Sequence, residues 1–116
     1  MIKNKQDGLA REGQVEKQLQ KENPNSTIIS ESYLSDKDGK IVKDPVTGEA
    51  RRVDFVVVSN AKVDKMVEVT SLTASKDKQM AKENRIRENG GQYIKDNNGN
   101  LIKIPSNVKT KIERRA

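Results

Sequence analysis

The sequence contains no cysteine, no histidine and no tryptophan. Without cysteine, a disulfide framework, a thiolate zinc site, an iron–sulfur cluster and a cysteine nucleophile are excluded. Without histidine, an imidazole acid–base pair and a Ser-His-Asp triad are excluded. Any chemistry must therefore come from carboxylates, lysine, arginine, hydroxyls, tyrosine or a metal ion held by oxygen atoms. Oxygen ligands favour Mg, Mn or Ca, and zinc stays open outside finger-type sites.

Apolar and aromatic residues are also scarce. Hydrophobic residues make up 32% of the 116 residues, charged residues make up 34%, and the only aromatic residues are Tyr33, Phe55 and Tyr93. This composition predicts one domain, residues 1–116, with a small core. The sequence has no run of about 18 apolar residues and does not start with the apolar stretch of a secretory signal, so we expect a soluble chain without a membrane-spanning segment.

The chain carries 23 Lys and Arg against 17 Asp and Glu, a formal net charge of +6. A basic balance favours polyanionic partners such as nucleic acid. Three aromatic residues are too few for a platform that stacks single-stranded bases, so we expect recognition of a folded RNA such as a tRNA, or of duplex DNA. The candidate phosphate contacts lie late in the chain; the alternative for them is a solvated surface. They are Arg85, Arg87, Lys111, Arg114 and Arg115.

Short blocks of apolar residues predict the first half of the fold. Residues 5–22 are rich in Gln, Glu, Lys and Leu and precede Pro24, which predicts a helix. Strands are predicted over residues 26–34, 51–58 and 65–72. The second of these is the most apolar block, and we expect it to be buried on much of both faces.

Turn residues and glycines divide the rest of the chain. Turns on both sides of Ile41-Val42 predict a small hairpin or excursion before residue 51. A second helix is predicted over residues 75–88, with Ser75 as its N-cap and Asn89-Gly90-Gly91 as its end. Residues 93–94 and 101–104 predict a final hairpin, and a short helix is expected from Ser106 towards Arg115. We expect an α+β fold with a central mixed sheet flanked by helices.

Two acidic residues interrupt apolar strands. Asp54 lies between Val53 and Phe55, and Glu68 lies between Val67 and Val69. Asp is rare in strands, and an ionised carboxylate in a buried pattern must meet a cation, a metal ion or hydrogen-bond donors. We therefore take both as candidate catalytic residues and metal ligands.

The first helix offers a third carboxylate towards the same sheet. Leu9, Val15 and Leu19 define its apolar stripe, Glu12 lies almost at the centre of this stripe, and Glu16 lies nearer its edge. Carboxylates brought together repel one another unless a cation lies between them, and a divalent metal ion is the simplest such cation. The alternative is that these acids form ion pairs with Arg51, Arg52 or Lys76, or lie at the helix surface.

The second helix supplies a candidate cation for the site. Lys76 is in its first turn, close to the end of the strand that carries Glu68 and Thr70, and Gln79 follows one turn later. A surface lysine that lays its stem along the protein is the alternative interpretation of Lys76.

The order of these residues resembles the PD-(D/E)XK nuclease superfamily, whose core is α-β-β-β-α-β, the restriction-endonuclease-like core. In that family a helix Glu, a strand Asp and the Glu of the next strand bind one or two divalent ions, and these roles correspond to Glu12 or Glu16, Asp54 and Glu68. Val53 replaces the family proline, and Thr70 replaces the family lysine. The resemblance therefore implies Lys76 in the lysine role, with Thr70 and Gln79 as further catalytic candidates and Mg or Zn, or else Mn, as the cofactor.

The segments Arg11-Glu12-Gly13, Arg51-Arg52-Val53-Asp54 and Val67-Glu68-Val69-Thr70-Ser71, with Arg85-Ile86-Arg87 and Gly90-Gly91, also resemble C-terminal toxin modules of contact-dependent growth inhibition and related polymorphic toxins. This resemblance implies a nuclease toxin domain, exported as part of a larger toxin and acting in the cytoplasm of the target cell. It implies tRNA more than DNA as the substrate, and a cognate immunity protein as a partner. The alternatives are a non-enzymatic basic nucleic-acid-binding domain and a metal-independent nuclease that uses Lys, Thr and Arg.

Overall fold

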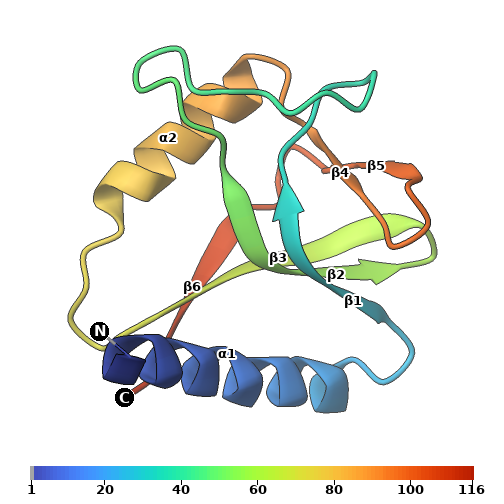
Figure 1. Ribbon diagram of the computed structural model, residues 1–116. Helices are drawn as coiled ribbons and strands as arrows, with labels where there is room; N and C mark the ends of the chain where they lie inside the picture. The colour runs from blue at the N-terminus through green and yellow to red at the C-terminus, as the bar shows by residue number, and fades with distance from the viewer. Residues whose placement is uncertain (1) are drawn as a thin grey trace.

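The computed structural model describes the backbone of residues 2–116 and the side chains of residues 9–116 (Figure 1). The predicted α+β class is confirmed, with two helices, a mixed four-stranded sheet and a small hairpin. The elements are α1 (Ile2–Glu22), β1 (Thr27–Tyr33), β2 (Arg52–Ser59), β3 (Lys62–Thr70), α2 (Asp77–Glu88), β4 (Tyr93–Lys95), β5 (Leu101–Lys103) and β6 (Thr110–Arg114).

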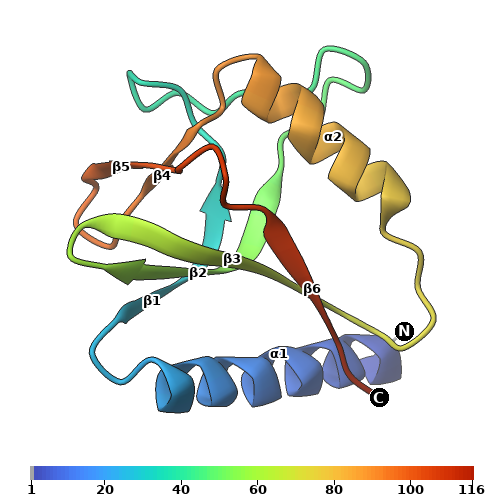
Figure 2. The same cartoon turned by 180° about the vertical axis from the view of Figure 1, so that it is seen from behind.

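The main sheet has the strand order β1-β2-β3-β6. Its first three strands pair antiparallel, whereas β6 runs parallel to β3 along its outer edge (Figure 2). The short helix expected from Ser106 is therefore wrong. A single turn or two of basic helix without an apolar stripe gains little, whereas the β-branched Thr110 and Ile112 can pair with the open edge of β3.

The sheet has a core on each face. α1 covers one face, where Val15 and Leu19 pack against Phe55, Val57 and Val67. On the other face, residues of α2, the β4–β5 hairpin and the segment after it pack on the sheet; these include Ile86, Ile94, Ile102 and Ile104. Because both faces are covered, β2 is buried on both sides, as its apolar block predicts.

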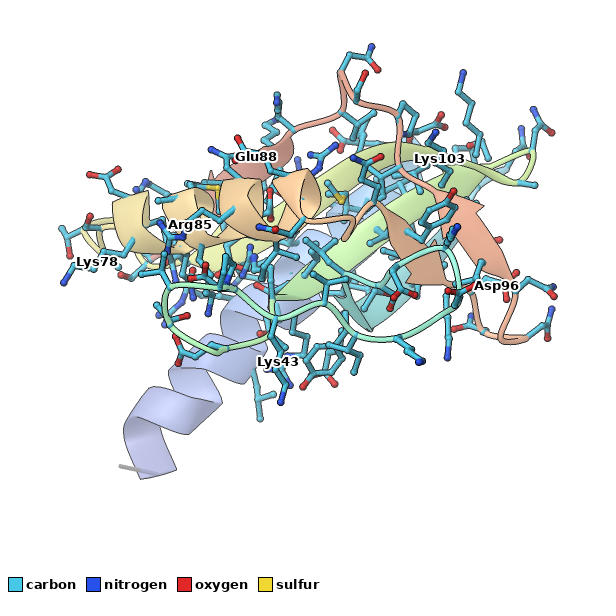
Figure 3. All side chains as sticks on the ribbon, turned by 90° about the horizontal axis from the view of Figure 1, so that it is seen from above. Lys43, Lys78, Arg85, Glu88, Asp96 and Lys103 are labelled. Carbon is cyan, nitrogen blue, oxygen red and sulfur yellow. The ribbon has the colours of Figure 1, made fainter. Side chains whose placement is uncertain are left out.

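The first helix is longer than the part of it that packs. Val15 and Leu19 are 1% and 5% exposed, whereas Leu9, which lines a hollow beside Phe55 of β2, is 58% exposed. Figure 3 shows that the N-terminal part of α1 extends past the sheet. α1 has 21 residues but is rich in Lys, Gln and Glu, and α2 has 12 residues, so neither helix within residues 2–116 could span a membrane.

The second helix starts one residue later than predicted and ends where predicted. Lys76, not Ser75, is its N-cap, and the Lys76 side chain makes no capping bond because an ammonium group has no acceptor for a backbone N–H; it pairs instead with a carboxylate of β3. Asn89 is the C-cap, and Gly90 adopts a left-handed conformation with φ 96°. At Gly91 a Cβ would lie 2.5 Å from Cγ2 and 2.9 Å from the carbonyl oxygen of Ile86, so the chain leaves α2 through a space that admits only glycine.

We predict that Gly91→Ala destabilises the fold by about 1–3 kcal/mol, because the new methyl group would push the fully buried Ile86 and its backbone out of place. Gly13→Ala is the matched control, since a Cβ at Gly13 in α1 meets nothing within 4 Å and should add up to about 1 kcal/mol of stability. Urea denaturation of both variants measures the two effects, and equal effects would contradict the close approach at Gly91.

Candidate functional site

The site lies where β2 and β3 separate. Their pairing runs from Ser59–Lys62 to Phe55–Val67; from there β2 continues beside β1, and β3 continues beside β6 (Figure 1). At this point the backbone N–H of Val69 donates to Oδ2 of Asp54, at 2.8 Å, in place of a backbone carbonyl of β2. We call this point the fork. Asp54 and Glu68, the two acids that interrupt the strands, lie on its two sides.

Both carboxylate oxygens of Glu68 are paired. Its Oε1 lies 3.2 Å from Nη2 of Arg51, and its Oε2 lies 3.2 Å from Nζ of Lys76. Glu68 is 5% exposed, and the Lys76 side chain is 18% exposed. The structure thus brings Lys76 to Glu68, and it also realises the ion pairs that were the structural alternative for this acid.

Arg51 connects this pair to a second buried acid. Its Nε lies 3.1 Å from Oε1 of Glu83, a residue of α2, and its Nη1 donates to the carbonyl of Arg52. The hydroxyl of Thr110 on β6 lies 2.8 Å from both carboxylate oxygens of Glu83. Lys76, Glu68, Arg51, Glu83 and Thr110 form what we call the charged network. It holds two cations and two carboxylates, so its burial leaves no net charge.

The side of Asp54 away from this network faces a hollow of about 230 Å³ beneath α1. Its lining brings the helix acids Glu12 and Glu16 together with Asp54, and adds Glu31 of β1. Ser30 pairs with Phe55 and Ser32 with Val53, so Glu31 lies across from Asp54. Glu31 could not be predicted from the sequence, because its place depends on the β1–β2 register, which no local pattern gives.

Two of the acids that line the hollow, Asp54 and Glu12, have raised pKa values, so their ionised forms are destabilised in the fold. Burial raises the pKa of Asp54 to about 6, helped by the neighbouring charges of Glu68 and Glu12 and opposed by the hydrogen bond from Val69. Burial also raises the pKa of Glu12, to which Glu31 and Glu68 add and which Arg52 partly offsets. Among the side chains of residues 9–116, no three acids stand close enough to form a ready metal site. The hollow is therefore an acidic region that favours a cation, with its acids still apart.

Of two further predicted site residues, Thr70 lies at the fork and Gln79 does not. Thr70 ends β3, is 6% exposed, and accepts the N–H of Arg115 at its carbonyl, so it belongs to the fork on the Glu68 side. Gln79 instead lines a separate hollow with Thr47 and Lys82, and its Oε1 is buried without a partner among the described residues. The structure does not bring Gln79 to Glu12 and Asp54.

Two of the predicted phosphate contacts already hold the fold together. Arg85 binds the fully buried carboxylate of Asp44 through two hydrogen bonds of 2.8 Å, which hold the pKa of Asp44 well below its usual range. Arg87 donates to the carbonyls of Val108, at 2.6 Å, and Pro105, at 3.1 Å. A contact of either residue with nucleic acid stays a prediction.

Of the three predicted contacts on β6 and beyond it, Lys111 and Arg114 are exposed and Arg115 is partly buried. Lys111 is on the surface, 3.0 Å from Glu113, which also pairs with Arg115. Arg115 reaches Gln18 of α1 as well, and Arg114 donates to the carbonyls of Ser71 and Ala74 after β3. Arg114 therefore lies beside the segment that connects Glu68 to Lys76.

Comparisons with family models, with curated proteins and with solved structures give no match to this chain. What the arrangement can do follows from its own groups. The hollow can attract a cation to carboxylate oxygens, and the ammonium of Lys76 can approach an anion next to them.

The raised pKa of Asp54 predicts how stability depends on pH. Because the folded state holds this proton more tightly than the unfolded state, the contribution of Asp54 to stability falls as pH rises from about 4 through 6. Asp54→Asn keeps an oxygen acceptor for Val69 and removes the charge, so it should be more stable than the wild type at pH 7.5, by about 1 kcal/mol after allowance for solvent screening.

Thermal melts from pH 4 to 8 measure this difference, which should disappear near pH 4. Asp64→Asn, an exposed acid on the same sheet, is the control and should show no such gain. An Asp54→Asn variant that is less stable than the wild type at pH 7.5 would show that the Asp54 charge is already compensated.

Proposed function

We propose that this chain is a metal-dependent nuclease that hydrolyses phosphodiester bonds at the fork. The observation that carries the proposal is the meeting of Asp54 from β2 and Glu68 from β3, with Lys76 at 3.2 Å from Glu68 and Glu12 in the adjoining hollow. Four different elements or connections supply these groups, which solubility alone does not explain.

The topology supports a member of the PD-(D/E)XK superfamily. With the β4–β5 hairpin left aside as an insertion, the order α1-β1-β2-β3-α2-β6 follows the core expected from the resemblance. The last strand lies parallel to β3 in a mixed sheet. This order places the acids on the second and third strands and a helix directly after them.

The donor set of the fork and hollow fits a divalent metal ion. The residues that would hold it are Glu12 or Glu16, Asp54 and Glu68, because they offer carboxylate oxygens and because burial, together with neighbouring negative charge, raises the pKa of Asp54 and Glu12. Bound Mg, Zn or Mn supplies polarisation of a phosphoryl oxygen and a lower pKa for a water molecule.

The residues of the chain have distinct parts in this proposal. Lys76 brings positive charge to an acidic region that would otherwise repel a phosphate group. Arg51 holds the other oxygen of Glu68 and so fixes its carboxylate plane. Thr70, at the end of β3, is a further polar residue on the Glu68 side of the fork. Gln79 would have to act from its separate hollow.

The substrate and the biological setting are further parts of the proposal. The net charge of +6 supports a nucleic acid, with tRNA favoured and DNA as the alternative. From the resemblance to polymorphic toxins we propose a role in interbacterial competition, export as part of a larger toxin, and a cognate immunity protein. A co-encoded acidic protein that binds tightly and blocks cleavage would support this setting.

One observation favours a second candidate, a non-enzymatic basic domain that binds nucleic acid. Both oxygens of Glu68 are already paired, with Arg51 and Lys76, as a purely structural role requires. Under this candidate, loss of Glu68 costs about 3–5 kcal/mol of stability and no nucleic acid is cut. Glu68→Gln should destabilise the fold under both candidates, so it cannot decide between them.

Asp54→Asn decides between the candidates, because Asp54 has no ion-pair partner among the described residues. We predict that it abolishes cleavage of total tRNA and plasmid DNA in Mg²⁺ or Mn²⁺ while leaving the circular dichroism spectrum unchanged. EDTA should abolish wild-type cleavage, and cleavage that survives EDTA would indicate the metal-independent mechanism. Full activity of Asp54→Asn would rule out the proposed site.

A melting experiment tests the metal site without activity. Mn²⁺ at about 100 times its Kd should stabilise the wild type by about 2.7 kcal/mol, because it binds the folded state alone. Asp54→Asn should lose most of this gain, whereas Asp64→Asn should keep it. Equal gains for all three proteins would place the metal ion elsewhere.

Lys76→Met tests the cation of the site. We predict a loss of cleavage rate of about 10²-fold or more, because the charge that faces the developing phosphate charge is removed. Lys78→Met, an exposed lysine on the same helix, is the control and should change the rate little. A similar loss in both variants would show that Lys76 acts only through the overall positive charge of the surface.

A further inference from the structure

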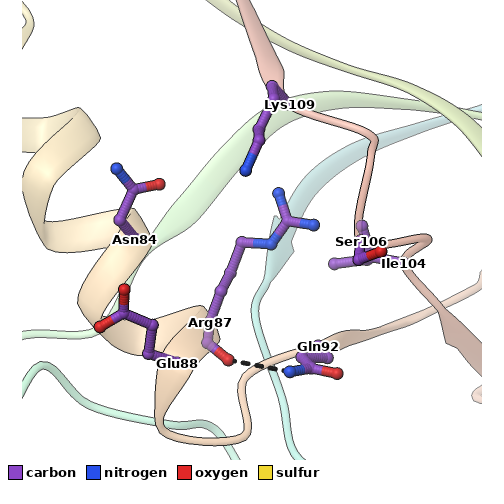
Figure 4. A pocket seen from close by; sticks show the side chains of 7 residues that line it. All are labelled: Asn84, Arg87, Glu88, Gln92, Ile104, Ser106 and Lys109. Atoms are coloured by element: carbon purple, nitrogen blue, oxygen red, sulfur yellow. Dashed lines mark hydrogen bonds between the residues drawn. The ribbon is translucent and has the colours of Figure 1, made fainter.

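Another hollow, of about 180 Å³, which we call the Arg87 hollow, lies at the C-terminal end of α2 (Figure 4). α2 lines it with Asn84, Arg87 and Glu88, and the segment between β5 and β6 lines it with Ser106 and Lys109. Figure 4 shows the guanidinium of Arg87 and the ammonium of Lys109 directed into the same space, with the amide of Asn84 beside them.

Arg87 is a buried cation that has no acidic partner among the described residues. It is 9% exposed, and its acceptors among the described residues are two neutral carbonyls, those of Val108 and Pro105. A guanidinium has more N–H donors than these two bonds use. A buried charge is costly unless an opposite charge meets it, and here a second cation faces it instead.

The charges of the hollow favour an oxyanion. Arg87 and Lys109 stand against one lining carboxylate, that of Glu88, which leaves one positive charge in excess. The dipole of α2 favours cations at this end of the helix, so an anion would be held by side chains and not by backbone N–H groups. Arginine with lysine, an amide and a hydroxyl forms the donor set that suits a phosphate group.

We propose that this hollow binds a phosphate group of the nucleic-acid backbone. The phosphate chemistry stands on the hollow alone, whereas its assignment to a nucleic acid rests on the proposed function.

β6 connects the two sites. Lys109 directly precedes β6, and Arg114 at the other end of β6 binds the carbonyls of Ser71 and Ala74, which lie between Glu68 and Lys76 (Figure 2). The five residue steps from Lys109 to Arg114 span roughly 17 Å of strand. A nucleic-acid backbone bound at the Arg87 hollow would therefore follow the outer edge of the sheet towards the fork.

Isothermal titration with inorganic phosphate, in EDTA, tests the hollow itself. Lys109→Gln should weaken phosphate binding by about 2–5-fold and Glu88→Gln should tighten it by a similar factor, because each changes one charge at the rim. Lys103→Gln removes an exposed lysine outside the hollow and should leave the affinity unchanged. Equal effects of Lys109→Gln and Lys103→Gln, or no effect of Glu88→Gln, would overturn the proposal.

Anisotropy titrations of labelled tRNA and duplex DNA against increasing salt test the source of the phosphate. In an Asp54→Asn background with EDTA, Lys109→Gln should reduce the salt slope of binding by about one, and Lys103→Gln should not. A hollow that binds inorganic phosphate while the salt slope ignores Lys109 would overturn the nucleic-acid assignment. If the chain never cleaves but both patterns hold, the nuclease proposal fails and the phosphate site stands.

Discussion

The guanidinium of Arg51 lies between the carboxylates of Glu68 on β3 and Glu83 on α2, and the rest of the site depends on this contact. Arg51 directly precedes β2, so one side chain ties the start of that strand to the next strand and to the second helix. Thr110 extends the tie to β6 through Glu83. Because the apolar core is small, these contacts hold β3 and α2 together where β2 no longer pairs with β3.

The fork explains how an acidic residue can sit in an apolar strand. Where β2 and β3 separate, Val69 would lose a backbone acceptor, and the carboxylate of Asp54 replaces it. The same separation lets the charged network fill the space between the strands and leaves Asp54 open to the hollow beneath α1. Asp54 therefore accepts the hydrogen bond that the backbone at Val69 requires and also presents its carboxylate to the hollow.

Local patterns in the sequence predicted the strand acids, both helices, the final hairpin and the approach of Lys76 to Glu68. They did so because burial periodicity and turn residues are properties of neighbouring positions. Arg51 was named only as an alternative ion-pair partner, and Glu83 and Glu31 escaped prediction, because the partners of these residues are distant in sequence and are set by register and packing. The edge strand β6 was mistaken for a helix for the same reason, since its pairing partner lies some 40 residues earlier.

The parallel pairing of β6 with β3 also sets an order on folding. Strands β1 to β3 can form by local hairpins, but the connection from β3 to β6 contains α2 and the whole β4–β5 hairpin. Contacts across so long a connection form slowly, because the entropy of loop closure is lost before the stabilising contacts form. Every candidate ligand precedes β6 in the chain, yet Glu83 gains Thr110 and β3 gains its second neighbour only when β6 pairs. The charged network is therefore complete only after β6 has paired with β3.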